Sequence, residues 1–282
     1  MPPRHNTRAV NYRHAFHAGN HADALKHLAL LACLARFKAK PAPFFTLDTH
    51  AGAGAYDLTS AAAQRSPEWR DGIGALIGLT DAPPALAAYL EAVRAFNPEA
   101  ALTRYPGSPA LIAAALRPQD RYAACELHPE EAAQLRAALR GTPAQIHVRD
   151  GWGALKALLP PPEKRGLVLV DPPYEAPDEL GRAARAIAEA RTRFAHGTYL
   201  WWRPLKAPGA LDAADAEARA GLPCEVLRTD LWRAPPQRDG PMTASSLLVL
   251  NPPFGLRAAL DEALPVMAAA LGDAAGQRVR AS

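Results

Sequence analysis

Residues 166–174 read Gly-Leu-Val-Leu-Val-Asp-Pro-Pro-Tyr. The run 166–170 is apolar throughout and ends just before two prolines, which is the pattern of a short buried strand bounded by a breaker. Alanine-rich segments of helical character, such as 130–140 and 178–194, separate most of the strand-like segments, and a further helix is predicted over 21–38, ahead of the first strand. Strands that alternate with helices predict a parallel sheet with helices on both faces, that is, an α/β fold. The other predicted strands are 44–48, 121–126, 145–150, 198–202, 224–229 and 246–250.

The turn Asp171-Pro172-Pro173-Tyr174 follows this strand directly. Its two prolines fix the backbone φ and remove N–H donors, so that carbonyl oxygens can point into a pocket. With the Asp171 carboxylate, these carbonyls can accept both hydrogens of an aryl amino group, and Tyr174 offers a flat face on which a base can stack. Such a turn is typical of enzymes that methylate exocyclic amino nitrogens, although a proline pair also ends ordinary strands.

A second proline pair, in Asn251-Pro252-Pro253-Phe254, also follows an apolar run. The residue types alone do not show which of the two turns is catalytic, but their positions along the chain do. Asp171 comes after the acids described next, as a catalytic turn should, whereas Asn251 ends the seventh predicted strand. In this kind of fold the seventh strand is usually antiparallel and ends at the opposite edge of the sheet. We therefore expect Asp171 to be catalytic and Asn251 to be structural.

Acidic residues end four successive predicted strands: Asp48, Glu126, Asp150 and Asp171. Asp48 opens the glycine-bearing turn Asp48-x-x-x-Gly52-x-Gly54, where the backbone can approach a ligand closely. Glu126 is placed to accept two ribose hydroxyls, and Asp150 to meet an adenine amino group. The four carboxylates should line one crevice, an arrangement that resembles S-adenosylmethionine-dependent methyltransferases. The Gly-x-Gly-x-x-Gly turn of a dinucleotide enzyme is not present in that form.

Composition narrows the class of protein. Of the 282 residues, 49% are hydrophobic, yet no stretch is long and apolar enough to span a membrane, and residues 1–5 do not resemble a signal peptide. Three scattered cysteines favour a reducing, cytoplasmic setting. The net charge of +4 is concentrated in residues 1–42, which hold seven Lys or Arg and one acid. This segment is either a phosphate-binding arm or a solvated tail.

The interval from Asp48 to Glu126 is far longer than the roughly 20–30 residues of a plain βαβ unit. We therefore expect residues 56–109 to form a small helical insertion at the rim of the site, which either grips a substrate or caps an edge. The methyltransferase domain would then comprise residues 1–55 and 110–282, with a basic arm over about residues 1–20.

Four histidines in the N-terminal region, His14, His17, His21 and His27, lie near Asp23. Two of them precede the predicted helix and no cysteine joins them, so we expect capping and surface roles rather than a metal site. Two further pairs of residues could bind ligands. Lys26 and His27 could touch an anionic group such as the methionine carboxylate, and Tyr12 and Arg13 could stack on a base and pair with a phosphate.

Segments spread over nearly the whole chain resemble the ribosomal RNA large subunit methyltransferase J family. That resemblance implies a Rossmann-like class I methyltransferase fold with a mostly parallel sheet of seven strands. It also implies methylation of N6 of one adenine in 23S ribosomal RNA, with S-adenosylmethionine as donor and no metal. The matching segments are YRHAFHAGNHADALKH (12–27), LDTHAGAG (47–54), YPGSP (105–109), ELHP (126–129), DPPY (171–174), MTAS (242–245) and NPP (251–253).

By this resemblance the methyl donor would contact Lys26, His27, His50, Ser108, Glu126, Asp150 and Gly151, and we expect Gly52 and Asp171 to contact it as well. Asp171 would be catalytic, with Pro172 and Tyr174, and Tyr12 would meet the RNA. Three features depart from the family pattern: about eight additional residues at the start, Arg203 in place of an aromatic residue, and Ser246 in place of a glycine, with Pro241 nearby. The last two departures lie away from the four acids and therefore concern RNA contacts more than chemistry.

Three other functions remain to be weighed against this one. An adenine-N6 DNA methyltransferase uses the same turn but usually carries a larger recognition domain. A glutamine-N5 protein methyltransferase favours Asn-Pro-Pro-Tyr rather than the turn at Asp171. An RNA-binding protein that has lost catalysis would not need Glu126, Asp150 and Asp171 together. We expect a monomer, because no spare apolar face is evident.

Overall fold

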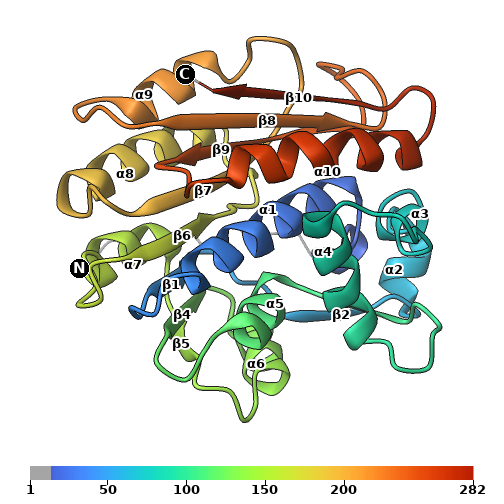
Figure 1. Cartoon of the computed structure of the whole chain (residues 1–282), viewed down its shortest axis with the longest axis horizontal. Coiled ribbons are helices and arrows are strands. Elements are labelled where there is room, and N and C mark those ends of the chain that lie inside the picture. Colours follow the sequence, from blue (N-terminus) through green and yellow to red (C-terminus); the bar gives the residue numbers. More distant parts are fainter. Residues whose placement is uncertain (1–13, 282) are drawn as a thin grey trace, which may run out of the picture.

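The computed structural model describes residues 14–281. Its centre is an eight-stranded sheet with the order β10-β8-β9-β7-β6-β1-β4-β5 (Figure 1). The strands from β5 to β7 pair in parallel, whereas β9 runs antiparallel to both of its neighbours and β10 runs antiparallel to β8. The strands are β1 (Phe45–Asp48), β4 (Arg121–Glu126), β5 (Gln145–Val148), β6 (Gly166–Val170), β7 (Thr198–Pro204), β8 (Val226–Trp232), β9 (Ala244–Leu250) and β10 (Gly276–Ala281).

The predicted α/β class, the seven predicted strands and the antiparallel seventh strand, β9, are confirmed. The prediction of seven strands in the sheet was incomplete, because β10 adds an eighth at the edge beside β8. Its sequence, GQRVRA, has an alternating but mostly polar character, so the apolar pattern that identified the other strands is missing.

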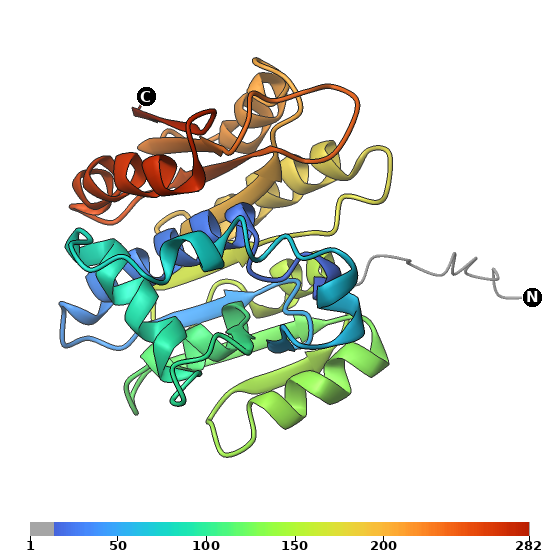
Figure 2. The ribbon, with the colours of Figure 1, turned by 90° about the vertical axis from the view of Figure 1, so that its right-hand side faces the viewer.

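Helices lie on both faces of the sheet (Figure 2). Along β6 the side chains alternate: Leu167 and Leu169 join one core cluster, and Val168 and Val170 join the other. On the first face lie α1 (His21–Lys38), α4 (Pro84–Ala95), α5 (Ser108–Ala115), α6 (Pro129–Ala138) and α10 (Leu256–Leu271); on the second lie α7 (Gly151–Leu158), α8 (Glu179–Arg193) and α9 (Asp212–Arg219). None of the helices in residues 14–281 has the length and hydropathy needed to cross a membrane.

Helix α1 matches the predicted range 21–38. Asn20 caps it, because its side-chain oxygen accepts hydrogen bonds from the N–H groups of Ala22 and Asp23, both at 3.0 Å. The helix is buried along most of its length, and its first two turns bury polar side chains as well as apolar ones. Buried charges need partners. We therefore expect a polar site around the start of α1.

The segment between β1 and β4 contains a two-stranded antiparallel ribbon, formed by β2 (Ala55–Asp57) and β3 (Arg104–Pro106), and α5 follows β3. Between these strands lie α2 (Ala61–Arg65), α3 (Ile73–Leu76) and α4, and α4 packs against α1 and α10. At Gly72 a Cβ atom would lie 2.2 Å from the carbonyl oxygen of Gly19. The segment therefore sits directly against the turn that precedes α1.

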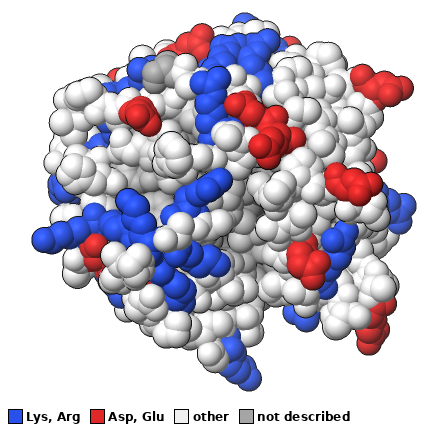
Figure 3. Space-filling model, in the orientation of Figure 1, with Lys and Arg blue, Asp and Glu red and all other residues white. Residues whose placement is uncertain are grey.

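The basic residues predicted as one arm are divided between two edges of the molecule. Lys26 lies in the first turns of α1, but three others lie at its far end, around loop 39–44, on the left of Figures 1 and 3, where Lys and Arg side chains gather. There Arg117 and Arg165 donate to carbonyls of the same loop, which stabilises the end of the helix. The three are Arg36, Lys38 and Lys40; Arg4, Arg8 and Arg13 are outside the described residues.

Candidate active site

A cavity of about 950 Å³ opens at the carboxyl ends of β1, β4, β6 and β7. Ligands of open α/β sheets bind at this edge. The described residues predicted for the site line this one cavity, with the exception of Asp48, whereas Tyr12 and Arg13 lie outside the described residues. Those brought together are Lys26, His27, His50, Gly52, Ser108, Glu126, Asp150, Gly151, Asp171, Pro172 and Tyr174.

The carboxylates at the ends of β4 and β5 are held by backbone N–H groups. Glu126 accepts hydrogen bonds from Gly52 at 2.9 Å and from His128 at 2.8 Å, so both of its oxygens are oriented. Asp150 caps α7 through the N–H of Gly153 at 3.0 Å and remains partly exposed. Both side chains reach the cavity with their positions already fixed, as a preorganised binding site requires.

The expectation that Asp48 lines the crevice was wrong. Its side chain is fully buried and accepts a hydrogen bond of 2.8 Å from the hydroxyl of Ser108, which itself lines the cavity. Desolvation raises the pKa of Asp48 to about 7. Asp48 therefore supports Ser108 from behind, and three of the four strand-end carboxylates face the cavity.

A chain of charged groups links α1 to the proline turn. Lys26 Nζ lies 2.5 Å from Asp171 Oδ2 and 2.8 Å from Asp23 Oδ1, and His14 Nε2 lies 2.8 Å from Asp23 Oδ2. Burial opposes ionisation of Asp23, yet His14 and Lys26 hold its pKa well below its usual range. Burial likewise opposes the charge on Lys26, but Asp171 and Asp23 hold its pKa well above the usual value. The four groups form one compensated unit.

The turn after β6 is anchored to β7. Tyr174 has a left-handed backbone with φ of 56°, its hydroxyl donates to the carbonyl of Trp202 at 2.6 Å, and it accepts from the indole N–H of Trp201 at 2.7 Å. Its ring meets Trp202 edge-on, with 5.7 Å between the centroids. These contacts hold the strained conformation and present the tyrosine ring as part of the cavity wall.

The second proline turn lies at the other edge of the sheet. The Asn251 side chain donates to the carbonyls of Ala195 at 2.7 Å and Gly197 at 2.9 Å, and Asn251 is absent from the residues that line the cavity. Its amide is thus used to hold two loops together, which is the structural role expected for it.

The histidines enter several different contacts. His17 lies 2.9 Å from Glu68, a residue of the segment between β2 and β3, and His27 lies 2.7 Å from the hydroxyl of Tyr105. Within residues 14–281 no three or more His, Cys, Asp or Glu side chains are grouped as a metal ion would need. The contacts of His17 with Glu68 and of Asn20 with Glu68 at 2.9 Å connect this segment to the cavity.

Unfolding should become easier as the pH falls from 6 to 5. Desolvation lowers the pKa of His21 to about 4 and the pKa values of His27 and His50 to about 3, so these side chains take up protons in this range only on unfolding. Asp48, with its raised pKa, releases one proton on unfolding. The unfolded state thus binds a net excess of about two protons, and the free energy of unfolding should fall by at most about 2.7 kcal/mol per pH unit.

Urea unfolding at several pH values measures this slope. His27→Gln should reduce it by about one proton equivalent, or roughly 1.4 kcal/mol per pH unit. If the slope of the free energy of unfolding against pH were unchanged in this variant, His27 would not be one of the groups that take up a proton on unfolding.

Gly151, the first residue of α7, has no side chain, so that its backbone can lie close to Thr49 and His50. A Cβ atom there would lie 2.2 Å from the carbonyl of Thr49 and 2.9 Å from the ring of His50. We expect Gly151→Ala to lower the free energy of unfolding by about 2 kcal/mol, because backbone and ring must both move. Gly78→Ala is the control: nothing lies within 4 Å of its Cβ position, so the change should stay within about 0.5 kcal/mol. Equal effects of the two substitutions would exclude this explanation.

Several residues that line the cavity were not predicted. Glu68, Trp202 and Lys206 come from segments without a recognisable motif, and Met242 begins the matching segment 242–245 but was not assigned to the site. Asp23 was considered only as a metal ligand, although its place in a largely apolar helix was a signal of a buried partner.

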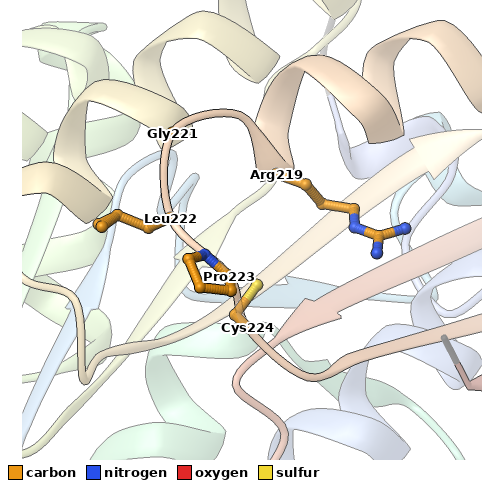
Figure 4. A pocket seen from close by; sticks show the side chains of 5 residues that line it. All are labelled: Arg219, Gly221, Leu222, Pro223 and Cys224. Atoms are coloured by element: carbon orange, nitrogen blue, oxygen red, sulfur yellow. The ribbon is translucent and has the colours of Figure 1, made fainter.

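A second, shallower hollow of about 370 Å³ lies beside the end of α9 (Figure 4). Its lining is the short run Arg219, Gly221, Leu222, Pro223 and Cys224, which includes no acid or histidine that could act with the cysteine. The larger cavity is therefore the candidate site.

Comparison with known proteins gives consistent matches. The family model described as "Ribosomal RNA large subunit methyltransferase D, RlmJ" matches residues 41–281. Two curated proteins named "Ribosomal RNA large subunit methyltransferase J" are each 39% identical to the chain. The protein of Escherichia coli aligns over 91% of this chain and 92% of its own length, and that of Haemophilus influenzae over 92% of each. A solved structure, protein LPL1258 from Legionella pneumophila, has 32% identity and a TM-score of 0.86, covering 94% of this chain and 98% of its own.

Proposed function

Because this chain belongs to the family of ribosomal RNA large subunit methyltransferases matched above, we propose that it methylates N6 of one adenine in 23S ribosomal RNA. Methylation of ribosomal RNA is the activity of the family, and the choice of an adenine N6 is our own step. The observation that carries this step is the placement of Asp171-Pro172-Pro173-Tyr174 in the wall of the large cavity. The amino group of adenine is the exocyclic aryl amine for which such a turn provides acceptors.

The donor set of the cavity fits S-adenosylmethionine. Glu126 and Asp150 offer carboxylates suited to a ribose and an adenine amino group, and Gly52 holds Glu126 in place through its backbone N–H. Lys26, His27 and Ser108 offer polar groups suited to the methionine moiety, and His50 also lines the cavity. When bound, this molecule supplies an electrophilic methyl group, and no metal is required.

Asp171 is the residue we assign to orient the target amine. Lys26 occupies its Oδ2 oxygen and leaves Oδ1 for the incoming N–H group. The carbonyl of Pro172 would accept the second hydrogen, and Tyr174 would contact the ring. The adenine must leave its stack to enter such a pocket. A carboxylate is a weak base for a neutral amine, so the proton should leave as the nitrogen gains positive charge. The rate then comes mainly from positioning.

The surroundings of the site extend this proposal. We assign Tyr12 and Arg13, which lie outside the described residues, to RNA contact. We propose that residues 56–109 form a subdomain that borders the substrate entrance, supported by the contact of Glu68 with Asn20 and His17. The enzyme would act as a monomer in the cytoplasm, where its RNA substrate is made.

Transfer of a tritiated methyl group from S-adenosylmethionine tests the function. The acceptors are 23S RNA from a strain that lacks this gene, the same RNA from a strain that has it, and matched duplex DNA. Labelling of the first RNA alone, recovered as N6-methyladenosine, is the expected result. Labelled DNA would favour the adenine-N6 DNA methyltransferase instead, and a label at another atom would refute the choice of N6.

A further inference from the structure

The cavity continues past the Asp171 turn to an end that the proposed donor does not use. Trp202, Pro204 and Lys206 line it from β7 and the residues that follow, and Pro241 and Met242 line it from the loop between β8 and β9. The proposed donor-binding residues come from the other side, at the ends of β1, β4 and β5 and the start of α1. The target nucleotide must therefore enter at the β7 end, beside Tyr174.

Charge compensation differs between the cations of this cavity. Lys26 lies between two carboxylates, at 2.5 and 2.8 Å. Arg182 lies 3.7 Å from Asp150 and packs over the ring of Trp152. Lys206 donates to the carbonyl of Gly240 at 3.0 Å, and no carboxylate of residues 14–281 forms an ion pair with it within 4.0 Å. Lys206 is thus an uncompensated positive charge at the nucleotide end of the cavity.

The neighbours of Lys206 suit one group of a nucleotide better than the others. Trp202, Pro204, Pro241 and Met242 are mainly apolar surfaces, which suit a base or the carbon face of a ribose. The single ammonium group, held at one of its three donors by Gly240, has two donors left for an anion. Trp202 also fixes the hydroxyl of Tyr174, so the ammonium and the ring that meets the base are positioned by the same strand.

We propose that Lys206 binds a backbone phosphate next to the target adenine. This inference rests on the proposed function, since it takes a nucleotide as the substrate. The interaction is a charge–charge contact to a phosphate, which is independent of base identity and weakened by salt. It should contribute to binding of the RNA rather than to the methyl-transfer step.

The first test compares Lys206→Gln with Lys40→Gln in steady-state methylation of the RNA. Lys40 is an exposed lysine at the opposite edge of the sheet, so both variants lose one positive charge. Lys206→Gln should raise KM for RNA by about tenfold with kcat changed less than twofold, and should lower the slope of log KM against log salt by about 0.7. Lys40→Gln should leave KM and slope as in the wild type. Equal behaviour of the two variants would overturn the proposal.

The second test does not depend on turnover and separates phosphate binding from support of the loop at Gly240. Calorimetry with S-adenosylhomocysteine present measures binding of adenosine and of its 5′- and 3′-monophosphates. Wild type should prefer one monophosphate over adenosine by about tenfold, and Lys206→Gln should lose this preference while its affinity for adenosine stays the same. Lys206→Arg should retain it. No preference in wild type, or equal weakening of all three ligands in Lys206→Gln, would refute the phosphate contact.

If wild type binds the monophosphates in this way but methylates no RNA, the proposed function fails and the phosphate site stands. If it methylates RNA and Lys206→Gln is unaffected in both tests, the phosphate site fails and the function stands.

Discussion

Replacing Asp171 by alanine is expected to lower kcat by about 10³, while the dissociation constant for S-adenosylmethionine changes by no more than a few-fold. The carboxylate is a preorganised acceptor aimed into the cavity, and loss of one such group typically costs 10²–10³ in rate. Lys26 keeps its pairing with Asp23, so the removal does not leave an isolated buried charge. The variant should therefore keep the shape of the cavity but lack the acceptor that orients the amine.

The substitution Asp171→Asn distinguishes the role of Asp171 in orienting the amine from the effect of its negative charge. The amide retains one oxygen acceptor, so if orientation dominates, this variant should keep more activity than Asp171→Ala. Single-turnover rates with saturating RNA and calorimetry with the donor measure the two effects. A loss of donor binding that matches the loss of rate would show that Asp171 acts mainly on the donor, contrary to our assignment.

The largest expected effect on stability is at Asp215, on α9. Asp215 forms an ion pair with Arg203, whose side chain is fully buried, and also lies 3.1 Å from Arg228. Breaking a buried pair by removing one partner leaves an uncompensated charge, which typically costs 3–5 kcal/mol. We expect Asp215→Ala to lower the free energy of unfolding by about 3 kcal/mol or more.

Asp212, on the same helix, provides the control. It lies 2.8 Å from Arg228, but its side chain is 67% exposed, so Asp212→Ala should cost about 1 kcal/mol or less. Urea unfolding of the two variants at neutral pH measures the difference. Similar losses in both would mean that Arg203 is compensated by other groups.

The same network explains two of the departures from the family pattern. Arg203 on β7 and Ser246 on β9 are direct partners across the sheet, and Arg203 donates to the Ser246 hydroxyl at 3.0 Å. The guanidinium also packs over Trp201, 4.7 Å from the ring centroid. The two departures are therefore one structural feature, located in the core beneath α9, and they do not belong to the RNA-binding surface that the sequence had suggested.

Most of the fold was predictable because it follows from local apolar pattern. The run at 166–170 and its counterparts identified the seven strands, and the leucine-rich spacing of 21–38 identified α1. The short strands β2 and β3 and the polar strand β10 carry no such pattern, because they are stabilised by their pairing partners. Pairing between distant segments is a tertiary effect that single-sequence periodicity does not capture.

The site was predictable where a strand end determined the position of a residue. Glu126, Asp150 and Asp171 reach the cavity for this reason, but Asp48 obeyed the same rule and is buried. The difference lies in Ser108, which comes from the far side of the segment between β1 and β4 and covers it. The end of the cavity that Trp202 and Lys206 line depends on how β7 and the β8–β9 loop pack together, and no sequence motif predicts that packing.

The outermost strand, β10, has a consequence for how the molecule behaves in a crowded solution. A sheet edge with unpaired N–H and C=O groups is a template on which another chain can add a strand. β10 covers the edge of β8, and its own exposed side chains include Arg278 and Arg280. Strand addition at this side would bring like charges of two copies together. The exposed arginines of β10 therefore disfavour aggregation through this edge of the sheet, and the apolar strands in its interior stay covered.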